Sequence, residues 1–137
     1  YRGSNRIRPV VAGKPVAKGI IERRDDLLTL IQRHPKVLAV LTGDEHNYNR
    51  LRLERAVQIY PEDWTAPRVT IARPFFQINN GAAGAPYYAQ EQTPWSAFVK
   101  AFSTQHAICL FHVDGRRVRL ETVNPETLEV LDQVVLR

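Results

Sequence analysis

The sequence has 137 residues and a net charge of +5, from 19 basic and 14 acidic side chains. This length suits about one domain and allows a hydrophobic core of ordinary size. No run of about 18 apolar residues occurs, and the first residues do not form a charged-then-apolar leader, so these residues predict neither a membrane span nor a signal peptide.

Arginine supplies 15 of the basic side chains and lysine only 4. The planar guanidinium group binds phosphate oxygens well, so this excess favours an anionic partner such as a phosphoester, a nucleic acid or an acidic surface. A solvated, arginine-rich surface would explain the same counts. Because the basic residues are scattered and form no block, they do not indicate a dedicated nucleic-acid surface, although a nucleic acid remains compatible.

The sequence contains no methionine. Since a new polypeptide begins with methionine, which is removed only before a small residue, Tyr1 indicates a fragment or a processed piece. We therefore expect any site to be shared with residues that precede this chain. The single cysteine, Cys109, lies in an apolar stretch and is interpreted as a small buried side chain, not as a nucleophile.

The chain begins with a segment that lacks apolar periodicity. Residues 1–19 combine glycine, proline and basic side chains, so we expect an extended connector. Apolar residues with helical spacing, followed by Pro35, predict a helix over about 20–33. Five consecutive aliphatic residues at 37–41 predict a strand buried on both faces. Together these elements form the αβ half of an α/β unit.

Three short strands are predicted in the middle of the chain. Apolar and charged residues alternate at 50–54, which predicts a half-exposed strand, and 69–71 and 75–78 predict two more. Residues 79–86 carry so little side chain that the backbone must approach another group closely or adopt left-handed angles. Such a segment is a candidate wall of a pocket.

A second helix is predicted after Thr93 and Pro94, which suit the N-cap and first helical positions. We expect its apolar face to pack on the core. The residues of that face are Trp95, Phe98, Val99 and Phe102.

The last third of the chain predicts an antiparallel meander. A strand at 106–113 is followed by the hairpin signal Asp114-Gly115 and by a returning strand at 118–122. Residues 128–136 predict a final extended pair. The fold class predicted from these elements is α+β.

The most informative stretch follows the predicted buried strand, where active sites of α/β proteins gather. Gly43 is followed by Asp44 and, two residues later, by His46. A carboxylate and a neutral imidazole on one tight loop can ligate one metal ion or two adjacent ones, and Zn, Mn and Fe accept such ligands. From the spacing alone, a structural Asp44 and a solvated His46 are the favoured alternative.

The context of this pair points to a known family. Gly43, His46, Tyr48 and Arg50 have the spacing of the Gly-His-x-His-x-Tyr-x-Arg signature, so the stretch resembles that of calcineurin-like metallophosphoesterases, purple acid phosphatases included. The small residues at 80–86 are similar to the glycine-rich strand end of that family, and the closing hairpin is similar to its C-terminal meander.

The resemblance implies a sandwich of two β-sheets, a mixed sheet and an antiparallel meander, flanked by helices. Residues 1–137 would form a single unit, the C-terminal half of that domain. It also implies a centre of two divalent or trivalent ions (Fe, Mn or Zn), at which a metal-bound hydroxide attacks phosphorus. His46 would ligate one metal and Asp44, in place of the family's usual histidine, the other. Contacts with the substrate or with the metal ligands are implied for Asn47, Tyr48, Arg50 and Asn80, and no residue is assigned as catalytic.

The family's earlier motifs, Asp-x-His, Gly-Asp and Gly-Asn-His-Asp, have no counterpart here. We therefore expect an N-terminal half of the same protein to precede Tyr1, supply most ligands and pack on this chain, which alone would be inactive. The predicted function is hydrolysis of phosphate esters, and the resemblance slightly favours a secreted or extracytoplasmic location. The alternative is a non-catalytic β-rich module that binds an anionic ligand or a partner domain.

Overall fold

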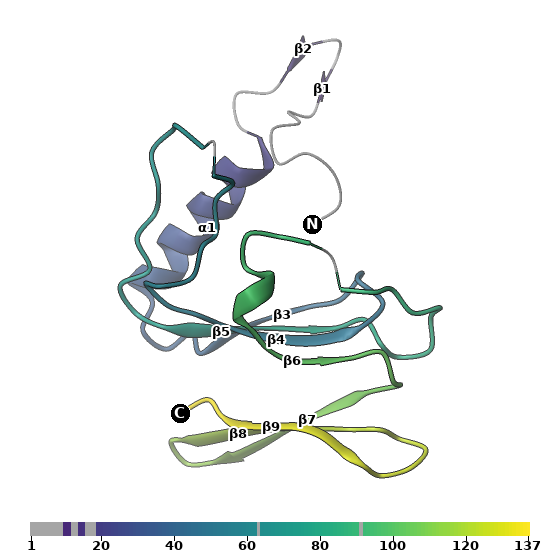
Figure 1. Ribbon diagram of the computed structural model, residues 1–137. Helices are drawn as coiled ribbons and strands as arrows, with labels where there is room; N and C mark the ends of the chain where they lie inside the picture. Colours follow the sequence, from purple (N-terminus) through teal and green to yellow (C-terminus); the bar gives the residue numbers. More distant parts are fainter. Residues whose placement is uncertain (1–9, 12–13, 16–18, 63, 91) are drawn as a thin grey trace.

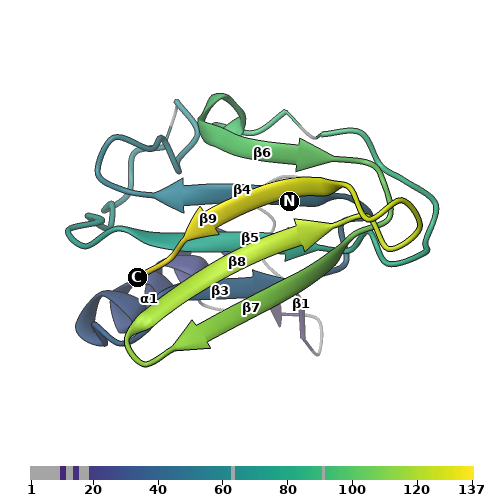
Figure 2. The same ribbon diagram turned by 90° about the horizontal axis from the view of Figure 1, so that it is seen from below.

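The protein is described by a computed structural model that covers residues 10–11, 14–15, 19–62, 64–90 and 92–137. A four-stranded mixed sheet forms the middle layer, with a helix on one face and a three-stranded antiparallel sheet on the other (Figures 1 and 2). The general α+β class predicted from the sequence is therefore confirmed. No helix among the described residues is long and apolar enough to cross a membrane.

The four-stranded sheet has the order β3-β5-β4-β6, in which β3 is parallel to β5 and the other neighbours are antiparallel. The strands of this sheet are β3 (Ala39–Thr42), β4 (Tyr48–Leu53), β5 (Phe75–Asn80) and β6 (Val99–Ser103).

The three-stranded sheet is the predicted meander, with the order β7-β8-β9. Its strands are β7 (Ile108–Asp114), β8 (Arg117–Val123) and β9 (Val130–Val135). The hairpin between β7 and β8 is confirmed, and Gly115 in its turn has φ +55°, a left-handed angle that glycine adopts without cost. The predicted final extended pair is wrong, because β9 is one strand that pairs with β8.

The predicted helix is confirmed as α1 (Ile20–Arg33). Its first turn is closed by Glu22, whose carboxylate accepts a hydrogen bond of 3.0 Å from the Gly19 amide. Its buried residues Ile21, Leu28 and Ile31 pack on the upper face of the sheet. Each such side chain contributes about 1.5–3 kcal/mol on burial, which explains why this helix lies on the sheet.

The two faces of the middle sheet follow from the alternation along β5. Gln77 and Asn79 lie on the side of α1, whereas Phe76 and Ile78 face the second sheet. There they pack in a separate hydrophobic core that includes the buried Leu120 of β8. The middle sheet is therefore covered on both faces, which fixes its register.

The strand predicted at 37–41 differs from the structure in place and in burial. It runs over Ala39–Thr42 as β3, pairs only with β5 among the described residues, and leaves Leu41 60% exposed. The prediction of a strand buried on both faces is therefore wrong. An aliphatic run indicates a strand but not its place in the sheet, and β3 lies at the edge.

The predicted helix after Thr93-Pro94 is also wrong. A short 3-10 turn, η1 (Ser96–Phe98), leads directly into β6, which pairs with β4. Valine and aromatic residues such as Val99 and Phe102 are as suitable for a strand as for a helix, and pairing with β4 decides between the two. No strand forms at 69–71.

The connector predicted at 1–19 lies largely outside the described residues. Within it, β1 (Val10–Val11) and β2 (Lys14–Pro15) form a short antiparallel pair.

Candidate functional site

The candidate metal-binding loop leaves the carboxyl end of β3, next to the carboxyl end of β5. Thr42 of β3 stands opposite Asn79 of β5, and the Asn79 side chain is almost completely buried. Its amide nitrogen donates to the carbonyls of Glu45 (2.9 Å) and Asn47 (2.7 Å). The backbone of the loop is thus bound to the sheet by one carboxamide, which holds the loop in a single position.

The small-residue segment after β5 lies against the same loop. A Cβ at Gly81 would overlap the backbone oxygen of Glu45, and the Gly81 amide donates to the Asn47 carbonyl at 3.2 Å. Gly84 has φ +111°, in the region that favours glycine. Both alternatives predicted for residues 79–86, a close backbone approach and a left-handed angle, are therefore confirmed.

The His46 ring is held on two sides. Its Nδ1 lies 2.7 Å from the carbonyl oxygen of Pro86, and its plane is stacked on the Tyr88 ring, with the ring centroids 4.2 Å apart. Because a carbonyl oxygen can only accept, Nδ1 carries the proton. In the neutral ring Nε2 then has the lone pair, which is the tautomer found in metal-bound histidines whose other nitrogen donates to a carbonyl.

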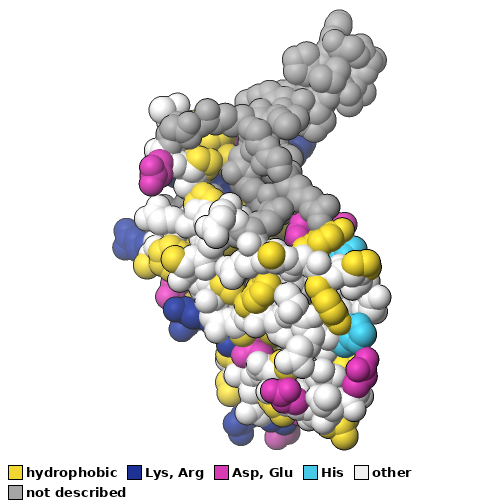
Figure 3. Space-filling model, turned by 45° about the vertical axis from the view of Figure 1, so that its right-hand side comes forward, with side chains coloured by type: hydrophobic (Ala, Val, Ile, Leu, Met, Phe, Trp, Pro, Cys, Tyr) yellow, Lys and Arg dark blue, Asp and Glu magenta, His cyan; other side chains and the backbone are white. Residues whose placement is uncertain are grey.

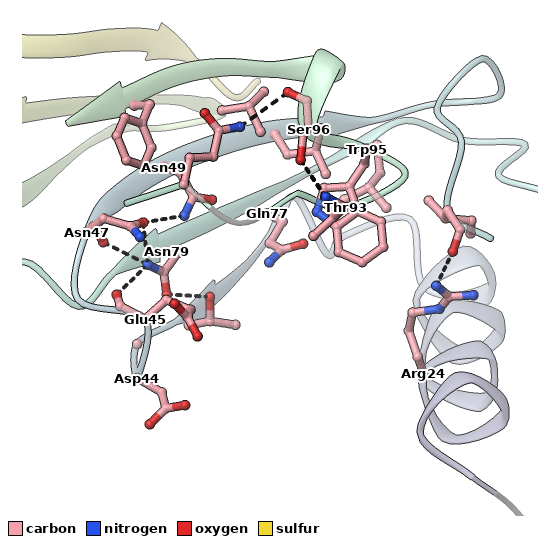
Figure 4. Close-up of a pocket in the computed structure, with 18 residues that line it drawn as sticks. Arg24, Asp44, Glu45, Asn47, Asn49, Gln77, Asn79, Thr93, Trp95 and Ser96 are labelled. Carbon is pink, nitrogen blue, oxygen red and sulfur yellow. Dashed lines mark hydrogen bonds between the residues drawn. The ribbon is translucent and has the colours of Figure 1, made fainter. Parts of the chain in front are cut away.

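Asp44 lies two residues before His46, with a left-handed backbone of φ +76°. Its side chain is exposed and points away from the residues of the neighbouring cavity (Figure 4). Among the described residues, no group of three or more His, Cys, Asp and Glu side chains could hold a metal ion. The metal roles of His46 and Asp44 stay predictions.

Tyr48 and Arg50 lie on the opposite face of β4, between the two sheets. Arg50 donates from Nε (2.6 Å) and Nη2 (2.9 Å) to the carboxylate of Asp132 in β9, and the Tyr48 hydroxyl donates to it at 2.6 Å. Burial raises the pKa of Asp132, but the hydrogen bonds from Arg50 and Tyr48 outweigh it and hold that pKa below its usual value.

Burial, together with the hydrogen bond to Asp132, raises the pKa of Tyr48. These contacts bind β4 to β9 and thereby fix the strand that follows His46. The sequence analysis missed Asp132. Its signal was the one carboxylate in the largely apolar 130–136 segment, but nothing in the sequence pairs it with β4.

Asn80 also points toward the second sheet. Its amide nitrogen donates to the Ala107 carbonyl at 3.1 Å, and its buried Oδ1 has no hydrogen-bond partner among the described residues. Asn47 lies on the helix side instead, where its Oδ1 accepts from Asn49 at 2.7 Å. The predicted site residues are therefore divided between the loop at the end of the middle sheet and the two faces of that sheet. Their contacts with a substrate or with metal ligands stay predictions.

A cavity of about 400 Å³ opens on the helix side of the middle sheet, and Figure 4 shows its lining. Backbone and side chains of the 43–45 loop close one end, and Leu53, Ile59 and Arg24 lie toward the other. The small-residue segment 79–86, predicted as a candidate wall of a pocket, contributes only Asn79 to the lining. No sequence pattern indicated the rest of the lining, because it comes from several separate segments. Its polar lining is rich in carboxamides: Asn47, Asn49, Gln77, Asn79 and Gln90.

On the face shown in Figure 3, the described Lys and Arg side chains are scattered among acidic and apolar ones and form no single basic patch. Known proteins give no further indication: comparison of this chain with family models, curated proteins and solved structures finds no match.

Proposed function

We propose that this chain is the C-terminal part of a metal-dependent phosphoric ester hydrolase, in which His46 ligates a metal ion. The observation that carries the proposal is the orientation of the His46 ring. The contact between Nδ1 and the Pro86 carbonyl leaves Nε2 as the lone-pair nitrogen, and none of the described residues donates a hydrogen bond to it. This geometry supports the role implied by the sequence signature around Gly43, Tyr48 and Arg50.

The donors on this loop suit the metals of the proposal. A neutral imidazole and a carboxylate are accepted by Fe, Mn and Zn, and two such ions would supply an activated water and stabilise charge on phosphorus. The residues of this chain would hold and orient these donors. Asn79 binds the loop backbone, Tyr88 supports the imidazole ring, and Asp132 holds the strand that follows.

The proposal requires further ligands from an N-terminal half of the same protein. Each sheet has two edge strands, and on one side of the molecule these are β3 and β7 (Figure 2). On this side the Leu41 side chain is 60% exposed and the Val113 side chain is 69% exposed. Val113 lies on the same face of β7 as Phe111, which pairs with the buried Leu120 of β8. Val113 therefore faces the first sheet. Apolar side chains at an open sheet edge support the docking of further strands at this side.

The test is His46→Ala in the full-length protein, with metal content measured by elemental analysis and activity measured with an aryl phosphate. We expect bound metal and activity to fall together. His112→Ala is the matched control, because His112 lies exposed on β7 of the other sheet and should change neither quantity. Unchanged metal content and rate in His46→Ala would refute the ligand role.

A second measurement tests the division of the site. The 137-residue chain alone should show no appreciable activity, whereas the chain combined with its N-terminal half should bind metal and hydrolyse the ester. Hydrolysis by the chain alone would show that the catalytic residues are here. A full-length protein without metal or activity would favour the non-catalytic module.

A further inference from the structure

The floor of the cavity contains one carboxamide that the protein does not use. Gln77, in the middle of β5, stands between Val40 of β3 and Leu51 of β4 in the sheet register. Its half-buried amide projects into the cavity between Asn79 and Trp95 (Figure 4). It makes no hydrogen bond to any described residue, although a polar group between apolar neighbours gains stability from a partner.

The neighbouring carboxamides have partners in the protein. Asn79 binds the backbone of the loop, and Gln90 donates to the Ser96 carbonyl at 3.3 Å. The amide nitrogen of Asn49 donates to Asn47, which leaves Asn49 Oδ1 as a further acceptor that no described residue uses. Among the carboxamides of the lining, Gln77 is thus the one whose nitrogen and oxygen both lack a described partner. Single atoms without a described partner remain on Asn47 (Nδ2), Asn49 (Oδ1) and Gln90 (Oε1).

The cavity favours a ligand with a flat apolar surface. Trp95 and Phe102 contribute aromatic surface to its walls, and its volume of about 400 Å³ is typical of small-molecule sites. The guanidinium group of Arg24, at the far end, is already paired with the Asp25 carboxylate and the Ile59 carbonyl. The Asp44 carboxylate at the near end points outward, whereas Glu45 on the same loop also lines the cavity.

We infer that this cavity binds the adenine base of a nucleoside or nucleotide. The amide of Gln77 offers a donor beside an acceptor, which is the complement of the adjacent amino group and ring nitrogen of adenine. On its N7 edge guanine presents two adjacent acceptors, for which an unpaired arginine is the usual partner, and Arg24 is engaged. The indole of Trp95 provides a stacking surface, as aromatic side chains do for unpaired bases.

Combined with the proposed function, on which this step rests, the cavity indicates a substrate class. The 43–45 loop closes one end of the cavity and precedes His46 directly. A base bound over Gln77 with its ribose on the side of that loop would bring the phosphate near His46. The substrates would then be adenine nucleotides.

The test is fluorescence titration with adenosine, which has no phosphate. The chain has two tryptophans, and Trp64, which does not line the cavity, is removed in a Trp64→Phe background so that Trp95 alone reports. We expect a saturable change with adenosine and a weaker one with cytidine, whose amino group and ring nitrogen match the amide but whose single ring covers less of the indole. Responses to guanosine and methyl glucoside should be at least about tenfold weaker than the response to adenosine. No saturable response, or equal responses to all four compounds, would overturn the inference.

Gln77→Leu then tests the amide itself. We expect it to weaken adenosine binding about tenfold or more, which corresponds to about 1.4 kcal/mol. Gln133→Leu is the matched control on β9, outside the cavity, and should bind as the parent does. Equal affinity of Gln77→Leu and the parent would contradict the assigned contact. Calorimetric titration of the unsubstituted chain gives the same answer should Trp64→Phe fail to fold.

This experiment separates the inference from the proposed function. Adenosine requires no metal ion, so His46→Ala should bind it unchanged. Metal loss and inactivity in His46→Ala, together with no adenosine binding in the parent, would leave the hydrolase proposal standing and refute the adenine site. Adenosine binding by a full-length protein that neither holds metal nor hydrolyses the ester would support the adenine site and refute the hydrolase proposal.

Discussion

The Asp132 carboxylate should be the polar group whose removal costs this fold most. In Asp132→Ala, Arg50 loses two hydrogen bonds and Tyr48 loses one. The side chains of Arg50 and Asp132 are only 11% and 8% exposed, so water cannot replace the carboxylate well. Removing one partner of a buried ion pair costs about 3–5 kcal/mol, because the other charge is left without a partner. That is a large part of a domain's total stability of about 5–15 kcal/mol.

The measurement is urea unfolding followed by circular dichroism at pH 7. Glu54→Ala is the control, because Glu54 pairs with Arg52 at 3.7 Å on the surface, where both side chains are about half exposed. It should change the free energy of unfolding by less than about 1 kcal/mol. A loss of less than about 1 kcal/mol in Asp132→Ala would refute the reasoning.

A triple variant distinguishes an unpaired charge from lost packing. Tyr48→Phe, Arg50→Met and Asp132→Leu together remove every member of the network and keep its volume. Since apolar replacements of buried ion pairs are often neutral or stabilising, most of the lost stability should return. A triple variant as unstable as Asp132→Ala would show that packing, not the unpaired arginine, causes the loss.

The same carboxylate gives a pH dependence of known sign. Its pKa is lowered in the folded protein, so the unfolded chain binds a proton first as the pH falls. The stability that the ionised Asp132 carboxylate contributes is complete at pH values above its unfolded pKa of about 3.9 and is lost as the pH falls through its folded pKa. The difference in the free energy of unfolding between the parent and Asp132→Ala, measured by urea unfolding, should therefore become smaller below about pH 4. An unchanged difference at low pH would contradict this assignment.

Two further predictions concern the loop. Gly81→Ala should lower the free energy of unfolding by about 1–3 kcal/mol, because the added Cβ would overlap the Glu45 carbonyl. Gly43→Ala is the control and should change the free energy of unfolding little, because the space around that position is open. Equal effects of the two substitutions in urea unfolding would refute the close contact. Asp44→Ala should be less stable than Asp44→Gly by about 1 kcal/mol, because residue 44 has a positive φ, which glycine adopts more readily than alanine. Equal midpoints of the two variants in thermal unfolding would contradict this prediction.

The sequence by itself located the local features of this protein. Helical spacing predicted α1, alternation predicted β4, and the Asp114-Gly115 pair predicted the hairpin between β7 and β8. The small side chains at 79–86 predicted a close backbone approach or left-handed angles, and the structure shows the close approach at Gly81. Each of these features depends on neighbouring residues or on the space that a residue itself occupies, so a single sequence can reveal it.

The tertiary structure decided which elements are central and which residues meet. The aliphatic run that includes β3 lies at the edge of the sheet, whereas β5, which contains Gln77 and two asparagines, lies inside it. Asp132 is 82 residues from Arg50 in the sequence, and the cavity joins residues from α1 to β6. Local patterns cannot predict such pairings, because they depend on the order of the strands and on which face of each strand is covered.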